Sequence, residues 1–348
     1  MFSLNRSVPL NYIRCLITAS FTSRSCQFSR MAEGALHTEQ ELLRMVKSYV
    51  PKMTSNMYKG QCGRIGVLGG CQEYTGAPYF AAISALKVGA DLSHVFCTEG
   101  AAPVIKSYSP ELIVHPLLDR ANAVVEISEW LPHLLALVIG PGLGRDPKLF
   151  GNVKGVIQQA SELNIPLVID ADGVHIIGTE LDIIKGNAKA ILTPNFIECS
   201  RLYEKVFGEK LNQDKLMESV PALSEALEGV TIVCKGHKDV ITNGKVTVAC
   251  SNEGSVRRCG GQGDLLSGSM GTFSYWSHRA FDAESGDGGS ILKSLGPTIA
   301  SAYGACFLTR ECNRVAFAQH RRSMTTTDMI ASIGPVFQLH FENEDSKL

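Results

Sequence analysis

The sequence predicts an α/β fold of three layers, in which helices cover both faces of a mostly parallel sheet. The first observation is a set of short apolar runs with the length of buried strands, at 64–68, 94–97, 135–139, 167–169, 190–192 and 231–234. The second is that helix-length segments separate these runs, for example at 79–88, 148–164 and 196–207. Strands that alternate with helices form βαβ units, whose parallel sheets are buried on both sides.

Composition narrows the class of protein. The chain has 348 residues, enough for a sizeable core, and 45% of them are hydrophobic, which argues against a mostly disordered protein. The 33 Lys and Arg nearly balance the 34 Asp and Glu, giving a net charge of −1, so generic polyanion binding is disfavoured. Apolar runs such as 136–139 and 165–169 are far shorter than the ~20 residues that a membrane helix needs. Eleven cysteines without a CxxC pair predict reduced thiols.

The first thirty residues have the composition of a mitochondrial transit peptide. They contain four arginines and six serines, and no acidic residue precedes Glu33. A secretory signal would need an unbroken apolar stretch, which Asn11 and Arg14 interrupt. We therefore expect a transit peptide at 1–30 and a single domain at 31–348. The alternatives are a disordered extension and a second, cytosolic form that starts at Met31.

Three further local signals belong to the predicted fold. The sequence Thr38-Glu39-Gln40-Glu41 resembles a capping box that opens an amphipathic helix. Asn243-Gly244, between two apolar runs, predicts a hairpin near a sheet edge. The segment 282–290 is rich in Gly, Ser and acids, and predicts a loop or disordered insertion.

Functional residues are expected just after the strands, because ligands of open α/β sheets bind beyond the carboxyl ends. Glycines and Pro141 follow one strand at 140–145, where they permit either a tight turn or close approach of a ligand. Asp170 and Asp172 follow the next strand, where they would either help hold a metal or cap a helix. Asn195 and Glu198 form a capping-box pattern, but Glu198 could also support, through water, a Mg²⁺ ion bound to phosphates. Arg201 lies one helical turn beyond Glu198 and could reach the same anion.

The most specific segment is the glycine loop at 260–263 followed by Asp264 and a helical pattern of Leu265, Leu266, Met270 and Phe273. A helix that begins after such a loop presents free N–H groups and binds anions such as a transferring phosphoryl group. Asp264 at that point suits a general base that accepts a proton from an attacking hydroxyl, or simply a helix cap. Lys235, at the end of another strand, suits a phosphate contact.

Together these motifs resemble the ribokinase-like superfamily, whose elements appear here as Asn195-x-x-Glu198, Lys235-Gly236 and Gly260-Gly261-Gln262-Gly263-Asp264. Within it, the chain is similar to the ATP-dependent NAD(P)H-hydrate dehydratase family, from about residue 38 to 334. This closer resemblance rests on the segments 60–64, 76–79, 108–111, 140–145 and 257–264.

The resemblance implies a ribokinase-like three-layer fold and a repair reaction. The family uses ATP to phosphorylate the hydroxyl of the S-form of hydrated NADH or NADPH, and elimination of phosphate restores the reduced cofactor. It implies Asp264 as catalytic residue, with Gly261 and Gly263 in the anion hole, and Mg²⁺ with Glu198. The hydrate would contact Asp264 and a second set of residues, namely Gly142, Asn195, Phe196, Ile197, Glu198, Cys199, Ser200 and Arg201. ATP would contact Lys235, Gly236, His237, Lys238, Asp239, Gly254, Ser255, Val256, Arg257, Arg258, Cys259, Gly260, Gly261, Gln262 and Gly263.

The resemblance also implies a functional partner, and it leaves alternatives. Bacterial relatives often carry an epimerase domain and prefer ADP, whereas this length leaves no room for a second domain, so the epimerase would be a separate protein. A homo-oligomer is possible, and nucleic acid and membrane partners are not expected. A sugar or vitamin-alcohol kinase on the same scaffold would use the same Asp264, and a nucleotide-sensing module would keep only the binding loops.

Overall fold

The computed structural model describes residues 37–283 and 289–342. The chain divides at residue 38, and the second unit, 39–348, contains every described strand and helix. The expected transit peptide at 1–30 lies outside the described residues, and so does most of the expected loop at 282–290.

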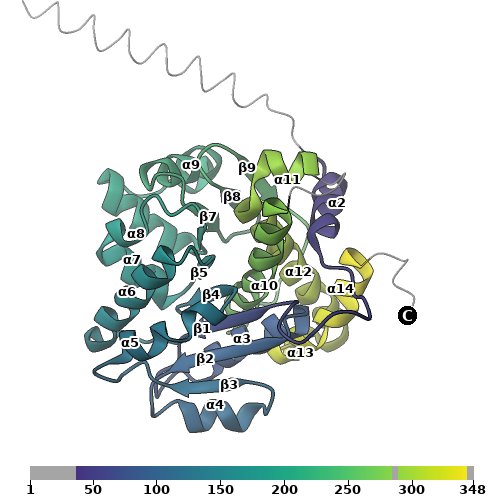
Figure 1. Ribbon diagram of the computed structural model, residues 1–348. Helices are drawn as coiled ribbons and strands as arrows, with labels where there is room; N and C mark the ends of the chain where they lie inside the picture. Colours follow the sequence, from purple (N-terminus) through teal and green to yellow (C-terminus); the bar gives the residue numbers. More distant parts are fainter. Residues whose placement is uncertain (1–36, 284–288, 343–348) are drawn as a thin grey trace, which may run out of the picture. The chain divides into compact units, whose positions relative to one another are not determined.

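Within the described part, one sheet of nine strands runs through the second unit (Figure 1). The strands pair in parallel except for β8 and β9, which add an antiparallel hairpin. In order across the sheet, they are β3 (Ile113–Pro116), β2 (Leu92–Cys97), β1 (Arg64–Leu68), β4 (Ala136–Ile139), β5 (Leu167–Ile169), β6 (Ala190–Leu192), β7 (Thr231–Cys234), β8 (Asp239–Thr242) and β9 (Thr247–Cys250).

The predicted strands are confirmed, and β1, β5, β6 and β7 have the expected bounds. The hairpin is confirmed as well, since β8 and β9 pair around Gly244, whose φ of 82° suits glycine in such a turn. It ends the sheet at β9, as expected. The apolar pattern missed β3, because this four-residue edge strand contains Pro116 and leaves Ile113 37% exposed.

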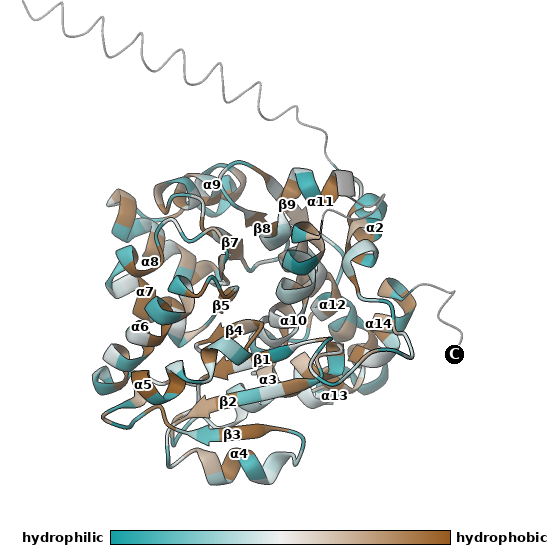
Figure 2. Ribbon diagram, viewed as in Figure 1, coloured by the Kyte–Doolittle hydropathy of each residue, from teal (hydrophilic) through white to brown (hydrophobic). Residues whose placement is uncertain are grey.

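Side chains of each central strand point alternately to two separate apolar cores, as the three-layer prediction requires. In β4, which is brown in Figure 2, Ala136 and Val138 enter one core, whereas Leu137 and Ile139 enter the other. The first core is covered by α2 (Glu39–Tyr49), α3 (Gly76–Val88), α4 (Ala102–Tyr108), α10 (Gln262–Asp282), α11 (Gly289–Leu295), α12 (Pro297–His320), α13 (Thr326–Ala331) and α14 (Ile333–Phe341). The second is covered by α5 (Ala123–Ser128), α6 (Pro147–Glu162), α7 (Asp172–Thr179), α8 (Phe196–Phe207) and α9 (Leu216–Ala226).

Two long helices, α10 and α12, are buried over most of their length and pack against each other in the first core. Helix α10 also lies so close to α3 that a Cβ atom on Gly268 would come 2.0 Å from the carbonyl oxygen of Ala81. A helix held on several sides has a fixed end. The amino end of α10, where Asp264 lies, is therefore positioned by the core itself.

The carboxyl ends of β5, β6 and β7 deliver polar residues to one edge of the sheet. Asp170 follows β5, and Asn195 and Lys235 follow β6 and β7 and pair through a further β-bridge. From β1, the next strands in sequence are added on one side of the sheet up to β3, and from β4 onward they are added on the other side. The order of strands therefore switches between the adjacent strands β1 and β4, and glycines follow each of these two strands. Ligand sites of open α/β sheets occur at such edges and switch points.

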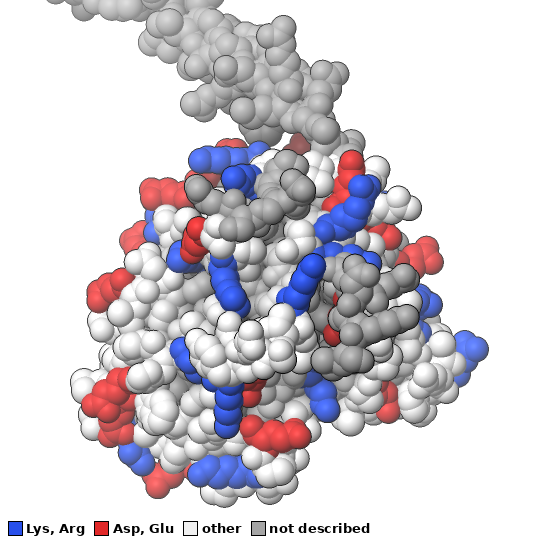
Figure 3. Space-filling model, turned by 45° about the vertical axis from the view of Figure 1, so that its right-hand side comes forward, with Lys and Arg blue, Asp and Glu red and all other residues white. Residues whose placement is uncertain are grey.

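Basic and acidic side chains are both spread over the face in Figure 3, in keeping with the balanced charge of the chain. No helix of the described residues is long and apolar enough to cross a membrane. All nine cysteines in the described ranges are free thiols.

Candidate active site

A cavity of about 660 Å³ opens at the carboxyl ends of β5, β6 and β7. Its walls come from the loops after these strands, the amino end of α10 and one side of α12. The lining residues are Asp170, Ala171, Asn195, Glu198, Lys235, Gly236, His237, Asp239, Gly254, Arg258, Gly261, Gln262, Gly263, Asp264, Leu266, Cys306, Thr309, Arg310 and Asn313.

The amino end of α10 forms an anion site within this cavity. Its cap is Gly261, with φ of 92°, so no side chain occupies the space before the first amides of the helix. A side chain would not fit there, because a Cβ atom on Gly261 would come 2.7 Å from the ring of Phe80. Unpaired N–H groups and the positive end of the helix dipole therefore face the cavity, and this is a suitable place for a phosphate.

Lys235 brings a positive charge to the same place. Its Nζ atom lies 2.7 Å from Oδ1 of Asp170, and a Cβ atom on Gly263 would be 3.5 Å from that nitrogen. Burial lowers the pKa of Lys235, but the charges of Asp170, Glu198 and Asp264 outweigh burial and raise it. The ammonium group therefore stays charged beside the helix end, ready for a phosphate.

The two aspartates after β5 have different roles. Asp170 is 1% exposed, and it accepts hydrogen bonds from Lys235 and from the Thr193 hydroxyl, the latter at 2.7 Å. Asp172 accepts a 2.9 Å hydrogen bond from the Gly144 N–H and lies 3.9 Å from Arg145. Asp170 thus orients Lys235, and Asp172 holds the glycine turn after β4.

Asp264 is the third residue of α10 and is one of the residues that line the cavity. Burial, with the nearby charge of Asp170, raises its pKa to about 7, although Lys235 acts in the opposite direction. A base with a pKa near the working pH is ionised in a substantial fraction of molecules and is also basic enough to accept a proton from a hydroxyl. The site therefore combines a base, an anion hole and a cation within one cavity.

Glu198 takes part in a capping box and also lines the cavity. Its Oε2 accepts a 2.8 Å hydrogen bond from the Asn195 N–H, and Asn195 Oδ1 accepts one from Glu198 N–H at 3.0 Å. Burial raises the pKa of Glu198, and the charges of Asp170 and Asp172 add to this. The capping interpretation of the sequence pattern is therefore confirmed.

A separate group of aromatic side chains lies beside Gly142, where the sheet changes direction. Gly142 has φ of 65°, and a Cβ atom there would come 2.5 Å from the carbonyl oxygen of Tyr74. Tyr79 lies with its ring centre 5.2 Å from that of Tyr108, and Tyr74 is 57% exposed. Phe80, next to Tyr79, is the residue that touches Gly261, so this aromatic group adjoins the anion site.

Comparison with known proteins decides the family. Residues 65–335 match the family model of the NAD(P)H-hydrate dehydratases. Human ATP-dependent (S)-NAD(P)H-hydrate dehydratase is 53% identical over 315 residues, which cover 90% of this chain and 89% of the human one. The bovine protein of the same name is 55% identical and covers 90% and 94%. This chain belongs to the NAD(P)H-hydrate dehydratase family. The resemblance seen in its motifs is confirmed.

Solved structures of more distant proteins share the fold. A ribokinase-like superfamily protein of Enterococcus faecalis superposes with a TM-score of 0.68 at 21% identity, covering 86% of this chain and 95% of that one. An ADP/ATP-dependent NAD(P)H-hydrate dehydratase of Bacillus subtilis, co-crystallised with ATP and Mg²⁺, gives 0.61 at 19% identity, covering 85% and 96%. These likenesses confirm the predicted ribokinase-like three-layer fold.

The structure brings half of the predicted site residues to the cavity wall. These are Asn195, Glu198, Lys235, Gly236, His237, Asp239, Gly254, Arg258, Gly261, Gln262, Gly263 and Asp264. The others surround it in different settings. Phe196 and Cys199 pack into the second core, the Ser200 hydroxyl accepts a 3.4 Å hydrogen bond from Leu211 N–H, and Gly142 lies beside Tyr74. Ile197, Arg201, Lys238, Val256 and Gly260 are exposed, and Ser255, Arg257 and Cys259 are half-buried.

Sequence reasoning missed the side of the cavity formed by α12, which adds Cys306, Thr309, Arg310 and Asn313 to this family member's site. It also left open the role of Asp170. A signal for α12 was present in the sequence, because Arg310 and Asn313 are polar residues three positions apart that directly follow the apolar first half of a mostly buried helix. Polar residues on the buried side of a helix need partners, and here those partners are the loops of the cavity.

Proposed function

We propose that this family member catalyses the ATP-dependent dehydration of the S-form of hydrated NADH or NADPH, releasing NAD(P)H, ADP and phosphate. The names of the human and bovine relatives support the substrate and the use of ATP. One observation carries the chemical part of the proposal, namely Asp264 with a pKa of about 7 beside an anion-binding helix end. That arrangement suits transfer of a phosphoryl group to a hydroxyl.

In this mechanism, the hydroxyl oxygen on the hydrated ring attacks the γ-phosphorus of ATP while Asp264 accepts its proton, and the bond from that phosphorus to the bridging oxygen breaks, so that ADP leaves. The amides of the glycine loop at 260–263 and the Lys235 ammonium stabilise the charge on the transferred group. The new carbon–oxygen–phosphorus linkage then breaks at the carbon–oxygen bond, pushed by the lone pair of the ring nitrogen. The ring loses a proton as the double bond re-forms, so the hydroxyl oxygen leaves within phosphate.

Mg²⁺ with ATP also belongs to the proposal, and the residues fit it. An ATP-bound Mg²⁺ takes most of its ligands from phosphate and water, so a single outer carboxylate suffices. Glu198 lines the cavity, and its pKa is raised by burial and by the charges of Asp170 and Asp172, a strain that a cation would relieve. When bound, the ion would offset the charge of the phosphates.

The reaction products separate this proposal from the sugar or vitamin-alcohol kinase. The experiment supplies the purified S-hydrate with ATP and Mg²⁺ and follows the near-ultraviolet absorbance of NADH together with ADP. We expect NADH, ADP and phosphate in equal amounts, and ¹⁸O placed in the hydrate hydroxyl should appear in phosphate. ADP formed with a stable phosphorylated product, or equal turnover of simple sugars, would contradict the assignment of substrate.

We also propose that a separate epimerase supplies the S-form, so the R-hydrate should react only when an epimerase is added. A homo-oligomer is a further expectation, testable by light scattering of the purified protein. These two proposals concern partners and leave the chemistry of Asp264 unchanged.

Residues 1–30 are proposed to direct the domain at 31–348 to mitochondria, on the strength of their four arginines, six serines and lack of acids. Fused to a fluorescent reporter, residues 1–30 should give a mitochondrial signal, whereas a chain started at Met31 should remain in the cytosol. A cytosolic signal from both would contradict the proposal.

A further inference from the structure

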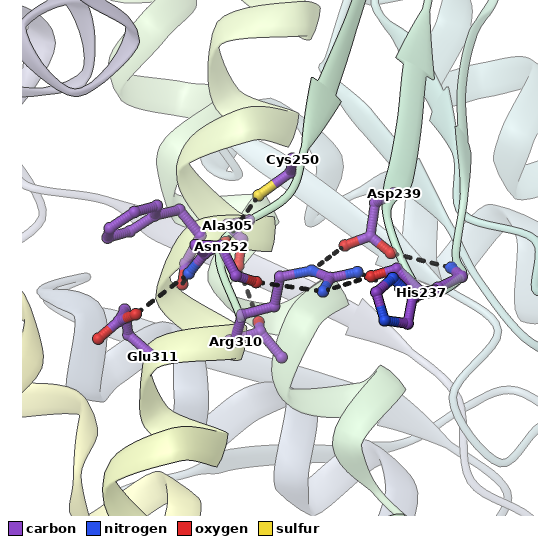
Figure 4. A network of polar contacts seen from close by, with 10 residues as sticks. His237, Asp239, Cys250, Asn252, Ala305, Arg310 and Glu311 are labelled. Carbon is purple, nitrogen blue, oxygen red and sulfur yellow. Dashed lines mark hydrogen bonds and ion pairs between the residues drawn. The ribbon is translucent and has the colours of Figure 1, made fainter. Parts of the chain in front are cut away.

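Arg310, on α12, joins the helix to two separate loops of the cavity (Figure 4). Its Nε donates to Asp239 Oδ2 at 2.7 Å, and its two terminal nitrogens donate to the carbonyl oxygens of Gly236 at 2.9 Å, His237 at 2.9 Å and Asn252 at 3.3 Å. Gly236 and His237 lie in the turn between β7 and β8, Asp239 is the first residue of β8, and Asn252 lies after β9. One guanidinium group therefore fixes both loops to one helix.

Asp239 completes this arrangement from the start of β8. Its second oxygen, Oδ1, accepts a 3.0 Å hydrogen bond from the Gly236 N–H, while Oδ2 is held by Arg310. The side chains of Asp239 and Arg310 are only 9% and 13% exposed, so solvent screens the ion pair weakly. The carboxylate is thus occupied on both oxygens by the protein, and its contribution to a bound ligand is through the shape of the turn.

Asn313, one helical turn beyond Arg310, holds the next part of the second loop. Its Oδ1 accepts a hydrogen bond from the Ser255 N–H, and its Nδ2 donates to the Arg257 carbonyl oxygen at 3.4 Å. Gly254 fits against it closely, since a Cβ atom there would come 3.1 Å from Asn313 Oδ1. The side chain is 4% exposed. This loop continues directly into the glycine loop before α10.

We propose that Arg310 and Asn313 are positioning residues for ATP, which hold the segments 236–239 and 252–257 in the conformation that binds the nucleotide. The inference rests on the proposed function, because these are the segments expected to contact ATP. Both residues also line the cavity with Thr309 of the same helix. Their hydrogen bonds reach backbone carbonyls and amides, so their effect is on loop geometry and should appear in ATP affinity rather than in the chemical step.

The test measures ATP binding by calorimetry without hydrate, and then the steady-state constants. In Arg310→Lys a single ammonium keeps the charge opposite Asp239 but cannot make four bonds in a planar fork. We expect the Kd and KM for ATP to rise roughly tenfold, with kcat and the KM for hydrate within about twofold of wild type. Asn313→Ala should act in the same direction. Arg120→Lys is the matched control, because Arg120 pairs with Glu126 outside the residues that line the cavity and is 42% exposed, and it should bind ATP as wild type does.

The outcomes are distinguishable. If Arg310→Lys fails to fold, Asn313→Ala still decides the question. A fall in kcat at an unchanged KM for ATP would mean loss of folded enzyme only, and would overturn the positioning role, as would unchanged ATP affinity in both variants. A wild-type protein that binds no ATP would instead refute the proposed function.

Discussion

Two parts of the cavity wall each contain an ion pair, but the charges cancel in one part and not in the other. We call the part around Lys235 and Asp264 the reactive end, and the part around Arg310 and Asp239 the rigid end. At one end, Lys235 pairs with Asp170 but also faces the carboxylates of Glu198 and Asp264. At the other end, Arg310 and Asp239 satisfy each other and the backbone around them. Negative charge is in excess at the first end, and burial with that excess moves the pKa of Asp264 to about 7. The uncancelled negative charge at the reactive end therefore raises the pKa of Asp264, whereas the neutral ion pair at the rigid end fixes the backbone of the loop around it.

The largest effect should come from Asp264, where the reactive end depends on one carboxyl group. Asp264→Asn keeps the shape but removes the proton acceptor, so kcat should fall by about 10²- to 10⁴-fold. ATP affinity should change little, and calorimetry provides this control. A variant with kcat within about threefold of wild type would show that Asp264 is not the base.

Lys235 should give the next largest effect, because we expect it both to bind the phosphates of ATP and to neutralise the buried Asp170. Lys235→Met should weaken ATP binding by roughly 10- to 100-fold, since a hydrogen bond to a charged group contributes about 1.5–3 kcal/mol. It should also lower the unfolding temperature, because it leaves the buried Asp170 carboxylate without its positively charged partner, with only the Thr193 hydroxyl as hydrogen-bond donor.

The double variant Lys235→Met with Asp170→Asn separates these two roles of Lys235. It should recover much of the lost stability, as followed by thermal unfolding, but not the ATP affinity. Recovery of both would mean that Lys235 acts on ATP only through the fold.

Asp170→Asn alone should shift the pH dependence. The negative charge of Asp170 raises the pKa of Asp264, while Lys235 lowers it. Removing that charge, and with it the partner of Lys235, should lower the pKa of Asp264. Turnover needs the ionised carboxylate, so the acid limb of the pH profile, expected near 7 in wild type, should move to lower pH. Glu180→Gln, which removes a remote pairing with Lys154, is the control and should leave the limb in place.

The placement of the residues at the reactive end could largely be predicted from the sequence, whereas the contacts at the rigid end could not. Asp264 directly follows the glycine loop, Lys235 directly follows β7, and Glu198 lies in the first turn of the helix after β6, so local pattern and chain order place them at the edge of the sheet. The strands were predictable for the same reason, because buried parallel strands are continuous apolar runs. Short, half-exposed β3 lacks that signal.

Arg310 and Asn313 could not be placed in this way. They lie more than fifty residues beyond the loops that they hold, and only the packing of α12 against α10 and the sheet brings them there. Asp239 illustrates the same limit: the family resemblance implies a contact with ATP, whereas in the structure its two oxygens bond Gly236 and Arg310. Long-range hydrogen bonds leave no periodic signal in a sequence.

The smallest effect should come from Glu198. One of its carboxylate oxygens accepts the hydrogen bond of the capping box, and the residue also lines the cavity near the negative charges of Asp170 and Asp172. Glu198→Gln keeps an oxygen for the Asn195 N–H, so the free energy of unfolding should change by less than about 0.5 kcal/mol, whereas Glu198→Ala should cost about 1 kcal/mol. If Glu198 also supports Mg²⁺, the glutamine variant should need several-fold more Mg²⁺ for half-maximal turnover, since an amide oxygen attracts the cation more weakly than a carboxylate. Titration of Mg²⁺ at saturating ATP measures this. Identical Mg²⁺ curves for wild type and Glu198→Gln would restrict Glu198 to its role in α8, and the balance at the reactive end would then rest on Asp170, Lys235 and Asp264 alone.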